Sequence, residues 1–390
     1  MKATTSYYLF SALLDFGLGV TVTAYAPFLL SLGLSLGQVG LVNAVFWIVV
    51  IASELPTGML ADSKSRAWSL KAGALMSSLG ALAYVIATDF WSAVLAESLI
   101  AIGIAFLSGA RQAWIADALE REGQAERKRQ VYATEAIVKA MMMLSGGIIG
   151  ALLALISYQL IFLPYAILGV LSFIFATRYM NSIGEPIDRV TELVALRRSI
   201  THLASSKELI WLVVTMIIFG VVVSFNHYWS IYFQPSVGQM GLSGVWAVIY
   251  LSLISSGIVV RKLKTPAGKE STSIAMAILL SGIGLFAISM MSGLVAPLAA
   301  VVVHEFGRGM FQPLTDSFVQ YRVKSSYRAT FGSLQSFLGH IGLALTPVVV
   351  WFLIEGKPNT IETISIVWHA NGLILISGAC LMWVIRPKHS

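Results

Sequence analysis

The chain has 390 residues, of which 57% are hydrophobic and only 12% are charged. Because soluble globular domains carry about a quarter charged residues, this composition excludes an ordinary water-soluble fold and indicates a protein surrounded by the lipid bilayer. The net charge of +7 does not indicate nucleic-acid binding, because membrane proteins gather Lys and Arg in cytoplasmic loops and no RNA-binding or zinc-finger pattern is present.

The single cysteine and the amino-terminal segment further limit the class of protein. The single cysteine, Cys380, lies in an apolar run, so we expect neither a disulfide framework nor a cysteine-based metal site. The first residues, MKATTSYYLF, lead directly into an apolar stretch longer than a signal-peptide core, which we interpret as a retained first span. There is no phosphate-binding loop, so we expect no ATP-driven step, and we expect no cofactor.

Apolar stretches long enough to cross a bilayer, about 20 residues each, recur along the chain in two groups. The first group lies near 6–30, 36–61, 69–88, 91–117, 130–154 and 158–178. The second lies near 209–234, 240–260, 270–292, 294–320, 328–354 and 361–386. We therefore predict an all-α membrane protein of about twelve spans. It divides into an N-terminal six-helix bundle (1–178), a polar linker (179–208) and a C-terminal six-helix bundle (209–390).

The basic residues predict the orientation of these spans. They fall on one side of the membrane, and the opposite loops hold essentially one, Lys357. Because cytoplasmic loops are enriched in Lys and Arg, we expect both termini and the linker to be cytoplasmic, in a multi-pass protein of the cell (inner) membrane. Both termini on one side require an even number of spans, which agrees with twelve. We expect a monomer.

The two halves also share short sequences at an offset of about 200 residues. The matching pairs are SLGQVGL (35–41) and SVGQMGL (236–242), Phe16-Gly17 and Phe219-Gly220, and Gly109 with Gln112 and Gly309 with Gln312. Parallel repeats of this kind are typical of transporters whose substrate site lies between the halves, near the membrane midplane.

Residues 54–66 read ELPTGMLADSKSR and follow the second predicted span. This segment resembles the signature loop of the major facilitator superfamily, in which a Gly, three residues and an Asp precede Gly-Arg-Arg or Gly-Arg-Lys. Gly58, Asp62 and Arg66 match that loop, and Ser65 stands where the second Gly is usual. The resemblance covers the whole chain and implies the major facilitator fold, with two pseudo-symmetric six-helix bundles and no enzymatic activity.

Two further segments resemble the twelve-span drug:proton antiporters of this superfamily. They are SGARQAWIADAL (108–119) in the fourth span and NHYWSIYF (226–233) in the seventh. The fifth span keeps Gly146, Gly147 and Gly150 of the antiporter motif but lacks its proline. The resemblance implies proton-coupled export of amphipathic or drug-like small molecules by alternating access. The expected partners are thus a small-molecule substrate, protons and the bilayer.

Ionisable side chains inside spans are costly, so they face the bundle interior or a wet cavity. They are Asp15, Glu54, Glu97, Arg111, Glu135, Lys139, Glu305, Arg308 and Asp316. Asp15 lies about 13 Å along the first span, with no basic residue near it on its own helix. A carboxyl group there can be neutral when dry and charged when hydrated, which makes Asp15 the leading candidate for proton coupling.

Two further acids are candidates for proton coupling, although basic residues accompany both on the same helix. Glu305 lies three residues before Arg308, and His304 lies four before it, so these side chains can meet and His304 can relay a proton. Glu135 lies four residues before Lys139, a spacing that also predicts a structural ion pair.

The cytoplasmic ends of the second and fourth spans carry the candidate gate. In the family that the signature loop resembles, its Asp and Arg hold the two halves together on the inside, which implies this role for Gly58, Asp62 and Arg66. Arg111 and Asp117, near the cytoplasmic end of the fourth span, are expected to join them.

Aromatic rings with a few polar groups suit amphipathic organic substrates, including cations. The expected substrate-binding residues are Tyr25, Asn226, His227, Tyr228, Arg308, Gln312 and His340. An aromatic belt at the membrane surface also explains the run around 229–233. Transport of a metal ion or chelate by Asp15, His227, His304 and His340 is an alternative, and a lipid flippase or receptor on the same fold is another.

Overall fold

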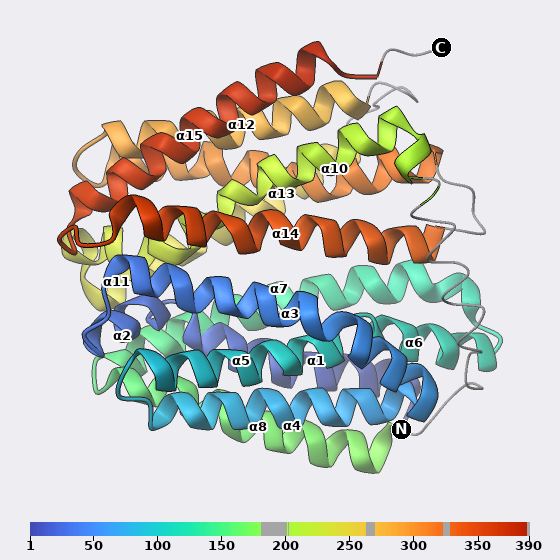
Figure 1. Ribbon diagram of the computed structural model, residues 1–390. Helices are drawn as coiled ribbons and strands as arrows, with labels where there is room; N and C mark the ends of the chain where they lie inside the picture. Colours follow the sequence, from blue (N-terminus) through green and yellow to red (C-terminus); the bar gives the residue numbers. More distant parts are fainter. Residues whose placement is uncertain (181–200, 202, 263–269, 323–327, 388–390) are drawn as a thin grey trace. The chain divides into compact units, whose positions relative to one another are not determined.

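The computed structural model describes residues 1–180, 201, 203–262, 270–322 and 328–387, and these residues are helical apart from short turns (Figure 1). They form two compact units. Unit 1 comprises Met1–Leu34, Val45–Arg189 and Gln239–Ser243, and unit 2 comprises Ser35–Ala44, Val190–Gly238 and Gly244–Ser390. The prediction of an all-α protein is confirmed, whereas most of the predicted linker 179–208, residues 181–200 and 202, lies outside the described residues.

The helices that make up unit 1 begin at the amino terminus. In chain order they are α1 (Ala3–Thr21), α2 (Tyr25–Ser31), α3 (Leu36–Lys64, whose first residues belong to unit 2), α4 (Arg66–Val85), α5 (Phe90–Leu107), α6 (Ala110–Arg121), η1 (Ala125–Arg127), α7 (Lys128–Ala154), η2 (Tyr158–Ile161) and α8 (Phe162–Tyr179). The predicted first and fourth spans are each divided, into α1 with α2 and into α5 with α6.

The first of these breaks follows from proline. Pro27 has no amide hydrogen, and its ring clashes with the carbonyl group four residues earlier, so the helix stops before it. The axes of α1 and α2 differ in direction by 47°. The second break lies at Gly109, whose φ of 69° is readily adopted only by a residue without a side chain. As a result, α6 starts afresh, with Arg111 in its first turn.

Helices α1 and α7 are in close backbone contact. A Cβ atom added at Gly146 would lie 2.8 Å from the Phe16 carbonyl oxygen, and one added at Gly150 would overlap the Val20 carbonyl oxygen. Thr23 Oγ1 also donates a hydrogen bond to the Gly147 carbonyl (3.2 Å). The glycines noted in the fifth predicted span therefore allow two backbones to approach closely, the usual role of small residues between membrane helices.

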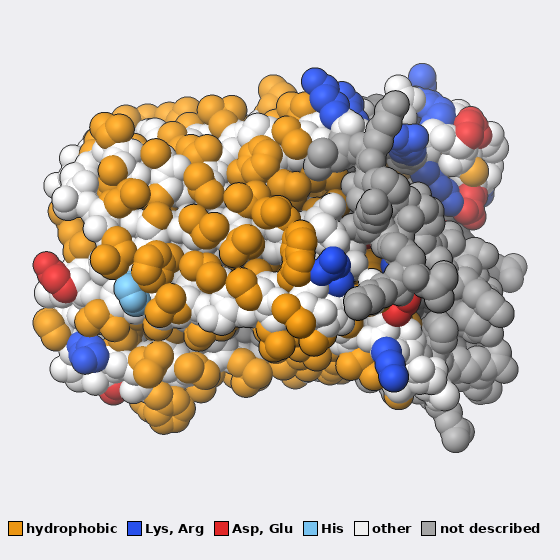
Figure 2. Space-filling view, turned by 90° about the horizontal axis from the view of Figure 1, so that it is seen from above, with side chains coloured by type: hydrophobic (Ala, Val, Ile, Leu, Met, Phe, Trp, Pro, Cys, Tyr) orange, Lys and Arg blue, Asp and Glu red, His pale blue; other side chains and the backbone are white. Residues whose placement is uncertain are grey.

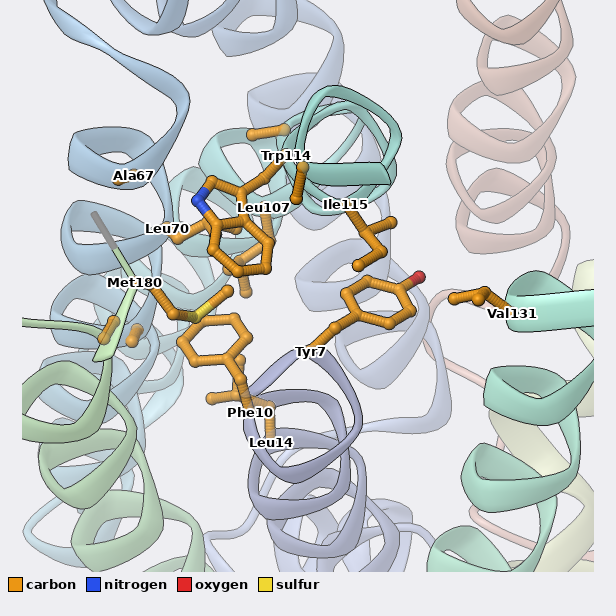
Figure 3. Close-up of a cluster of buried hydrophobic side chains, with 14 of the residues drawn as sticks. Tyr7, Phe10, Leu14, Ala67, Leu70, Leu107, Trp114, Ile115, Val131 and Met180 are labelled. Carbon is orange, nitrogen blue, oxygen red and sulfur yellow. The ribbon is translucent and has the colours of Figure 1, made fainter. Parts of the chain in front are cut away.

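A hydrophobic cluster fills one end of unit 1. Figure 3 shows Phe10 of α1, Trp114 of α6 and Met180 turned toward one another. The ring of Tyr7 lies below Ile115, and its hydroxyl group is directed toward α7 (Figure 3). Each of these side chains is at most 2% exposed, so this cluster fixes α1, α6 and α8 firmly next to the polar groups described below.

Unit 2 is built from the second set of helices. They are α10 (Lys207–Phe219), η3 (Gly220–Val222), α11 (Val223–Lys262), α12 (Glu270–Met290), α13 (Val295–Arg322), α14 (Arg328–Ile354) and α15 (Ile361–Val384). Helix α11 contains a non-helical residue, Gly238 (φ 66°, ψ 175°), shortly after Pro235. The predicted division between the seventh and eighth spans falls at this kink.

The described residues contain eight helical segments that are long and apolar enough to cross a membrane, or nine if α1 and α2 form one bent span. One segment, Lys207–Lys262, has 56 residues, so it is about 84 Å long and exceeds a single crossing of about 30 Å. Helices α4 and α13 are less apolar because they carry residues such as Lys71, Glu305 and Arg308. The number twelve therefore stays a prediction.

The surface of the described residues is strongly apolar. Exposed side chains include Trp91 (74% exposed), Ile156 (77%) and Phe352 (72%). The face shown in Figure 2 is covered mainly by hydrophobic side chains, and most of its Lys and Arg residues gather toward one end. A surface of this kind is unfavourable in water and favourable against lipid.

Candidate functional site

Three charged side chains meet inside unit 1. The Arg111 guanidinium lies 3.3 Å from the Asp15 carboxylate of α1 and 3.8 Å from the Glu135 carboxylate of α7. Arg111 Nη1 donates to both Asp15 oxygens, at 3.3 and 3.4 Å. The Asp15 side chain is 4% exposed and the Arg111 and Glu135 side chains 17% and 16%, so the cluster is largely buried.

The charges of this cluster do not balance. When both acids are ionised, two carboxylates share one guanidinium, and the surplus negative charge lies in a low-dielectric interior where it is costly. Two phenols, Tyr7 of α1 and Tyr165 of α8, also lie within electrostatic range of Asp15 and Arg111. Binding one proton, or one cation, would neutralise the cluster.

This geometry gives each of two acids a partner that spacing along its own helix does not predict. Asp15 has no basic neighbour on its own helix, but Arg111 reaches it from α6. Glu135 does not pair with Lys139 on its own helix: Lys139 is exposed, no ion pair joins them within 4 Å, and Glu135 faces Arg111 instead. The spacing of Glu135 and Lys139 predicted the wrong partner for Glu135. A largely buried cation on another helix stabilises the Glu135 carboxylate better than an exposed lysine does.

The gate candidates occupy a different part of unit 1. The Arg66 guanidinium, at the start of α4, pairs with the Asp117 carboxylate of α6 and donates to the Ala113 carbonyl oxygen (3.1 Å). Arg111 belongs instead to the Asp15 cluster, so the two gate candidates on α6, Arg111 and Asp117, pair with different partners. Gly58 is exposed with open space around it, and the Asp62 side chain lies outside the described residues.

Ser65, which replaces the usual glycine of the signature loop, has a clear structural role. Its backbone is extended (φ 171°), a conformation that any residue adopts, and its hydroxyl accepts a hydrogen bond from the Trp68 amide (3.1 Å). Serine is among the best residues for capping the amino terminus of a helix. The departure from the motif is therefore compatible with the loop.

A second buried polar cluster lies on α13 in unit 2. Glu305 is fully buried and pairs with Arg308 (2.6 Å), while its other oxygen, Oε1, has no hydrogen-bond partner among the described residues. His304 is also fully buried; its Nδ1 lies 2.8 Å from the Ser281 carbonyl oxygen, and its ring packs on Phe225. His304 therefore contacts α12 rather than Arg308. Further along α13, Gln312 donates to Asp316 (2.8 Å).

The other substrate-binding candidates are spread over both units. Tyr25 belongs to unit 1, on α2, and the rest belong to unit 2. Asn226 is exposed and His340 half-buried, whereas His227 is buried beside Tyr228. Tyr228 is 1% exposed and donates to the Leu36 carbonyl oxygen (3.1 Å), a contact within unit 2. That bond gives Tyr228 a structural role of its own.

Two polar groupings were not anticipated. In unit 1, Tyr84 donates a hydrogen bond to buried Glu97 (2.5 Å), and Tyr25 lies 3.2 Å from the Tyr84 hydroxyl. In unit 2, Arg322 pairs with Glu208 (2.5 Å) and Glu270 (3.4 Å), which joins α13 to α10 and α12. The sequence signalled only that Glu97 is an acid inside an apolar run, because the partners lie on other helices.

No group of three or more His, Cys, Asp and Glu side chains in the described part of the chain is arranged to hold a metal ion. His304 is bonded to a backbone carbonyl, and His227 packs on a phenol ring. The alternative of metal transport therefore finds no support in this part of the molecule.

Comparisons with known proteins agree with the fold. Residues 7–347 match the family described as the Major Facilitator Superfamily. A solved structure of the nucleoside transporter NupG has a TM-score of 0.81 at 14% identity, covering 98% of this chain and 99% of that one. A POT family transporter in complex with 5-aminolevulinic acid has a TM-score of 0.77 at 12% identity, covering 99% and 96%. A comparison with curated protein sequences found no match.

The family match covers most of the chain and identifies a multi-pass membrane transporter rather than an enzyme. This chain belongs to the major facilitator superfamily. The resemblance to the superfamily seen in the signature loop is thereby confirmed, while the more specific resemblance to the drug:proton antiporters stays a prediction.

Proposed function

We propose that this protein is a secondary active transporter that couples the movement of an organic small molecule to protons by alternating access. One observation carries the proposal: in unit 1 two carboxylates, Asp15 and Glu135, share the single guanidinium of Arg111. A surplus acid in a low-dielectric interior is stable when protonated and ionises when water reaches it.

The coupling follows from how that cluster changes with solvation. When the site is wet, both acids are ionised and their charge favours the hydrated conformation. Proton binding neutralises the surplus charge, so the dry conformation becomes accessible. A cationic group of a substrate can neutralise the same charge, so substrate and proton compete for it, and this competition produces antiport.

For the transport mode and the substrate class, we propose drug:proton antiport with export of amphipathic compounds. The supporting observations are the α1–α7 glycine contact, which uses the glycines of the antiporter motif, and the unbalanced acids. Symport of a nucleoside or a peptide is the second candidate, because structures of NupG and of POT family transporters share the fold.

The test uses purified protein in liposomes with an imposed pH gradient. The probes are a lipophilic cationic dye, a nucleoside and a dipeptide, one in each experiment. An antiporter accumulates the dye only when the lumen is acidic, whereas a symporter accumulates the nucleoside or the dipeptide only when the outside is acidic. If the accumulation of every probe is independent of the imposed pH gradient, proton coupling is rejected.

The variant Asp15→Asn isolates the role of the cluster. It keeps the size of the side chain and removes its proton, so we expect loss of uphill accumulation with retention of substrate exchange without a gradient. Glu122→Gln is the matched control, since Glu122 is exposed and forms no ion pair among the described residues. Uphill transport at the wild-type rate in Asp15→Asn would remove Asp15 from the coupling role.

We also propose the topology: two six-helix bundles at 1–178 and 209–390, with both termini and the linker in the cytoplasm and a monomeric protein in the cell membrane. Single cysteines in a Cys380→Ser background report this directly. Cysteines placed at either terminus should react with an impermeant maleimide only after the cells are opened, whereas one at Lys357 should react in intact cells.

A further inference from the structure

Glu97 of α5 forms the second buried acidic site of unit 1. Its side chain is only 7% exposed, and none of the ion pairs among the described residues includes it. Tyr84 of α4 donates to its Oε2 atom (2.5 Å), and the Tyr25 hydroxyl of α2 lies 3.2 Å from the Tyr84 hydroxyl. The three polar groups form one hydrogen-bonded chain.

Aromatic rings hold this chain in place. The Tyr84 ring stacks on Phe162 (4.6 Å between centroids) and meets the edge of Phe28 (5.8 Å). Tyr84 and Phe28 are fully buried, whereas Tyr25 is half-buried. Tyr25 is therefore the least buried of the three polar residues.

The groups that face Glu97 are phenols. Tyr84 comes from α4 and Tyr25 from α2, and Tyr165 of α8 lies within electrostatic range. A carboxylate buried without a cation is stabilised poorly in a low-dielectric interior, and a protonated carboxyl fits there better. Tyr165 is also within electrostatic range of Asp15 and Arg111, two charged groups of the coupling cluster.

The direction of the hydrogen bonds depends on the proton. With Glu97 ionised, Tyr25 donates to Tyr84, and Tyr84 donates to the carboxylate. With a proton on Oε2, the acid donates to Tyr84 and Tyr84 donates to Tyr25, which frees the Tyr25 hydroxyl hydrogen. The exchange proposed below takes its proton from water through Tyr25, the least buried of the three residues, so it needs no other reactant.

The position of Tyr25 connects this exchange to the break in the first span. Tyr25 is the first residue of α2, immediately after the 47° bend caused by Pro27. We propose that Glu97 is a second proton-binding site whose protonation reverses the hydrogen bonds of Tyr84 and Tyr25. We further propose that release of this proton moves α2 about the bend. The inference deepens the proposed proton coupling but does not depend on Asp15.

Infrared difference spectroscopy of the purified protein tests the site without a substrate. We expect the spectrum of the wild type minus Glu97→Gln to contain the carbonyl band of a protonated carboxyl at neutral pH, which disappears as the pH rises. Tyr84→Phe should shift that band, because it removes a hydrogen bond to the group. Absence of the band throughout the range where the protein is folded would overturn the proposal.

Movement of α2 needs a separate readout. Ser31→Cys, in a Cys380→Ser background, places a thiol at the exposed end of α2. We expect its maleimide labelling to accelerate several-fold more with pH than that of a control thiol at exposed Ser236 (Ser236→Cys), and Glu97→Gln to abolish this difference. Equal pH dependence at both positions would reject the movement. Failure of Asp15→Asn to uncouple transport would leave both results unchanged, so the two proposals fail separately.

Discussion

Arg111 of α6 lies 3.3 Å from Asp15 of α1, although 96 residues separate them in the sequence. The contact depends on two backbone features, the turn at Gly109 that starts α6 and the glycines that bring α7 to α1. Each can be altered without touching a charge, so the stability of the cluster and its role in transport can be measured separately.

Removing the guanidinium should destabilise unit 1 strongly. Arg111→Gln leaves Asp15 and Glu135 facing each other without a cation, and breaking a buried ion pair typically costs about 3 kcal/mol or more. Thermal unfolding in detergent should show a clearly lower midpoint. Adding Asp15→Asn should restore part of the loss, because one stranded charge is removed. Arg121→Gln, an exposed position, serves as the control. An unchanged midpoint in Arg111→Gln would show that the cluster carries little stability.

The α1–α7 contact predicts opposite effects for two glycine substitutions. Gly150→Ala places a methyl group against the Val20 carbonyl, so the two helices must separate and the protein should lose about 1 kcal/mol or more. Gly244→Ala meets nothing within 4 Å and should be neutral or slightly stabilising, because alanine is the better helix former. Midpoints of unfolding compare the two. Equal effects would mean that the close approach is not maintained in detergent.

The Arg66–Asp117 pair joins α4 to α6 beside the signature loop. Asp117→Arg should slow transport because it places two cations together, and Arg66→Asp should slow it because it places two acids together. The double exchange should recover much of the rate, with a coupling energy of about 1 kcal/mol. The readout is the initial rate of transport in liposomes at equal protein content. Additive losses would indicate that the two residues act independently.

The cap of α5 predicts a pH effect outside the membrane-spanning segments. Asp89 accepts a hydrogen bond from the Ser92 amide (2.8 Å), and this bond and the Ser92 hydroxyl lower the pKa of the Asp89 carboxyl. Because the pKa is lower in the folded state, the stabilisation is complete above the ordinary carboxyl pKa, about 4, and is lost as the pH falls through the folded value.

Asn and Ala at this position separate the cap from its charge. Asp89→Asn should keep the cap and flatten the acid limb of the stability curve, while Asp89→Ala should lower the unfolding midpoint at every pH. The measurement is the unfolding midpoint between acid and neutral pH for all three proteins. A wild-type acid limb that Asp89→Asn leaves unchanged would assign the effect to other acids.

The sequence predicted the helical class and the interior position of Asp15, because these depend on apolar length and on the cost of buried charge. It could not predict the partners. Glu135 and Lys139 have ideal spacing on one helix, yet Glu135 faces Arg111, since choice among cations depends on helix packing. Glu97 was recognised only as an acid in an apolar run, because Tyr25 and Tyr84 carry no local signal of their hydrogen bonds.

Arg322 has a consequence for the biosynthesis of unit 2. It is translated 114 residues after Glu208, the first of the two acids that it neutralises, and Glu270 is buried with it. Until α13 leaves the ribosome, the ends of α10 and α12 carry carboxylates that lack this cation, so these helices remain open to rearrangement. A chain whose synthesis stops before Arg322 is thus expected to be a substrate for membrane quality-control proteases. A chain that includes Arg322 can form its ion pairs with Glu208 and Glu270 and join α13 to α10 and α12.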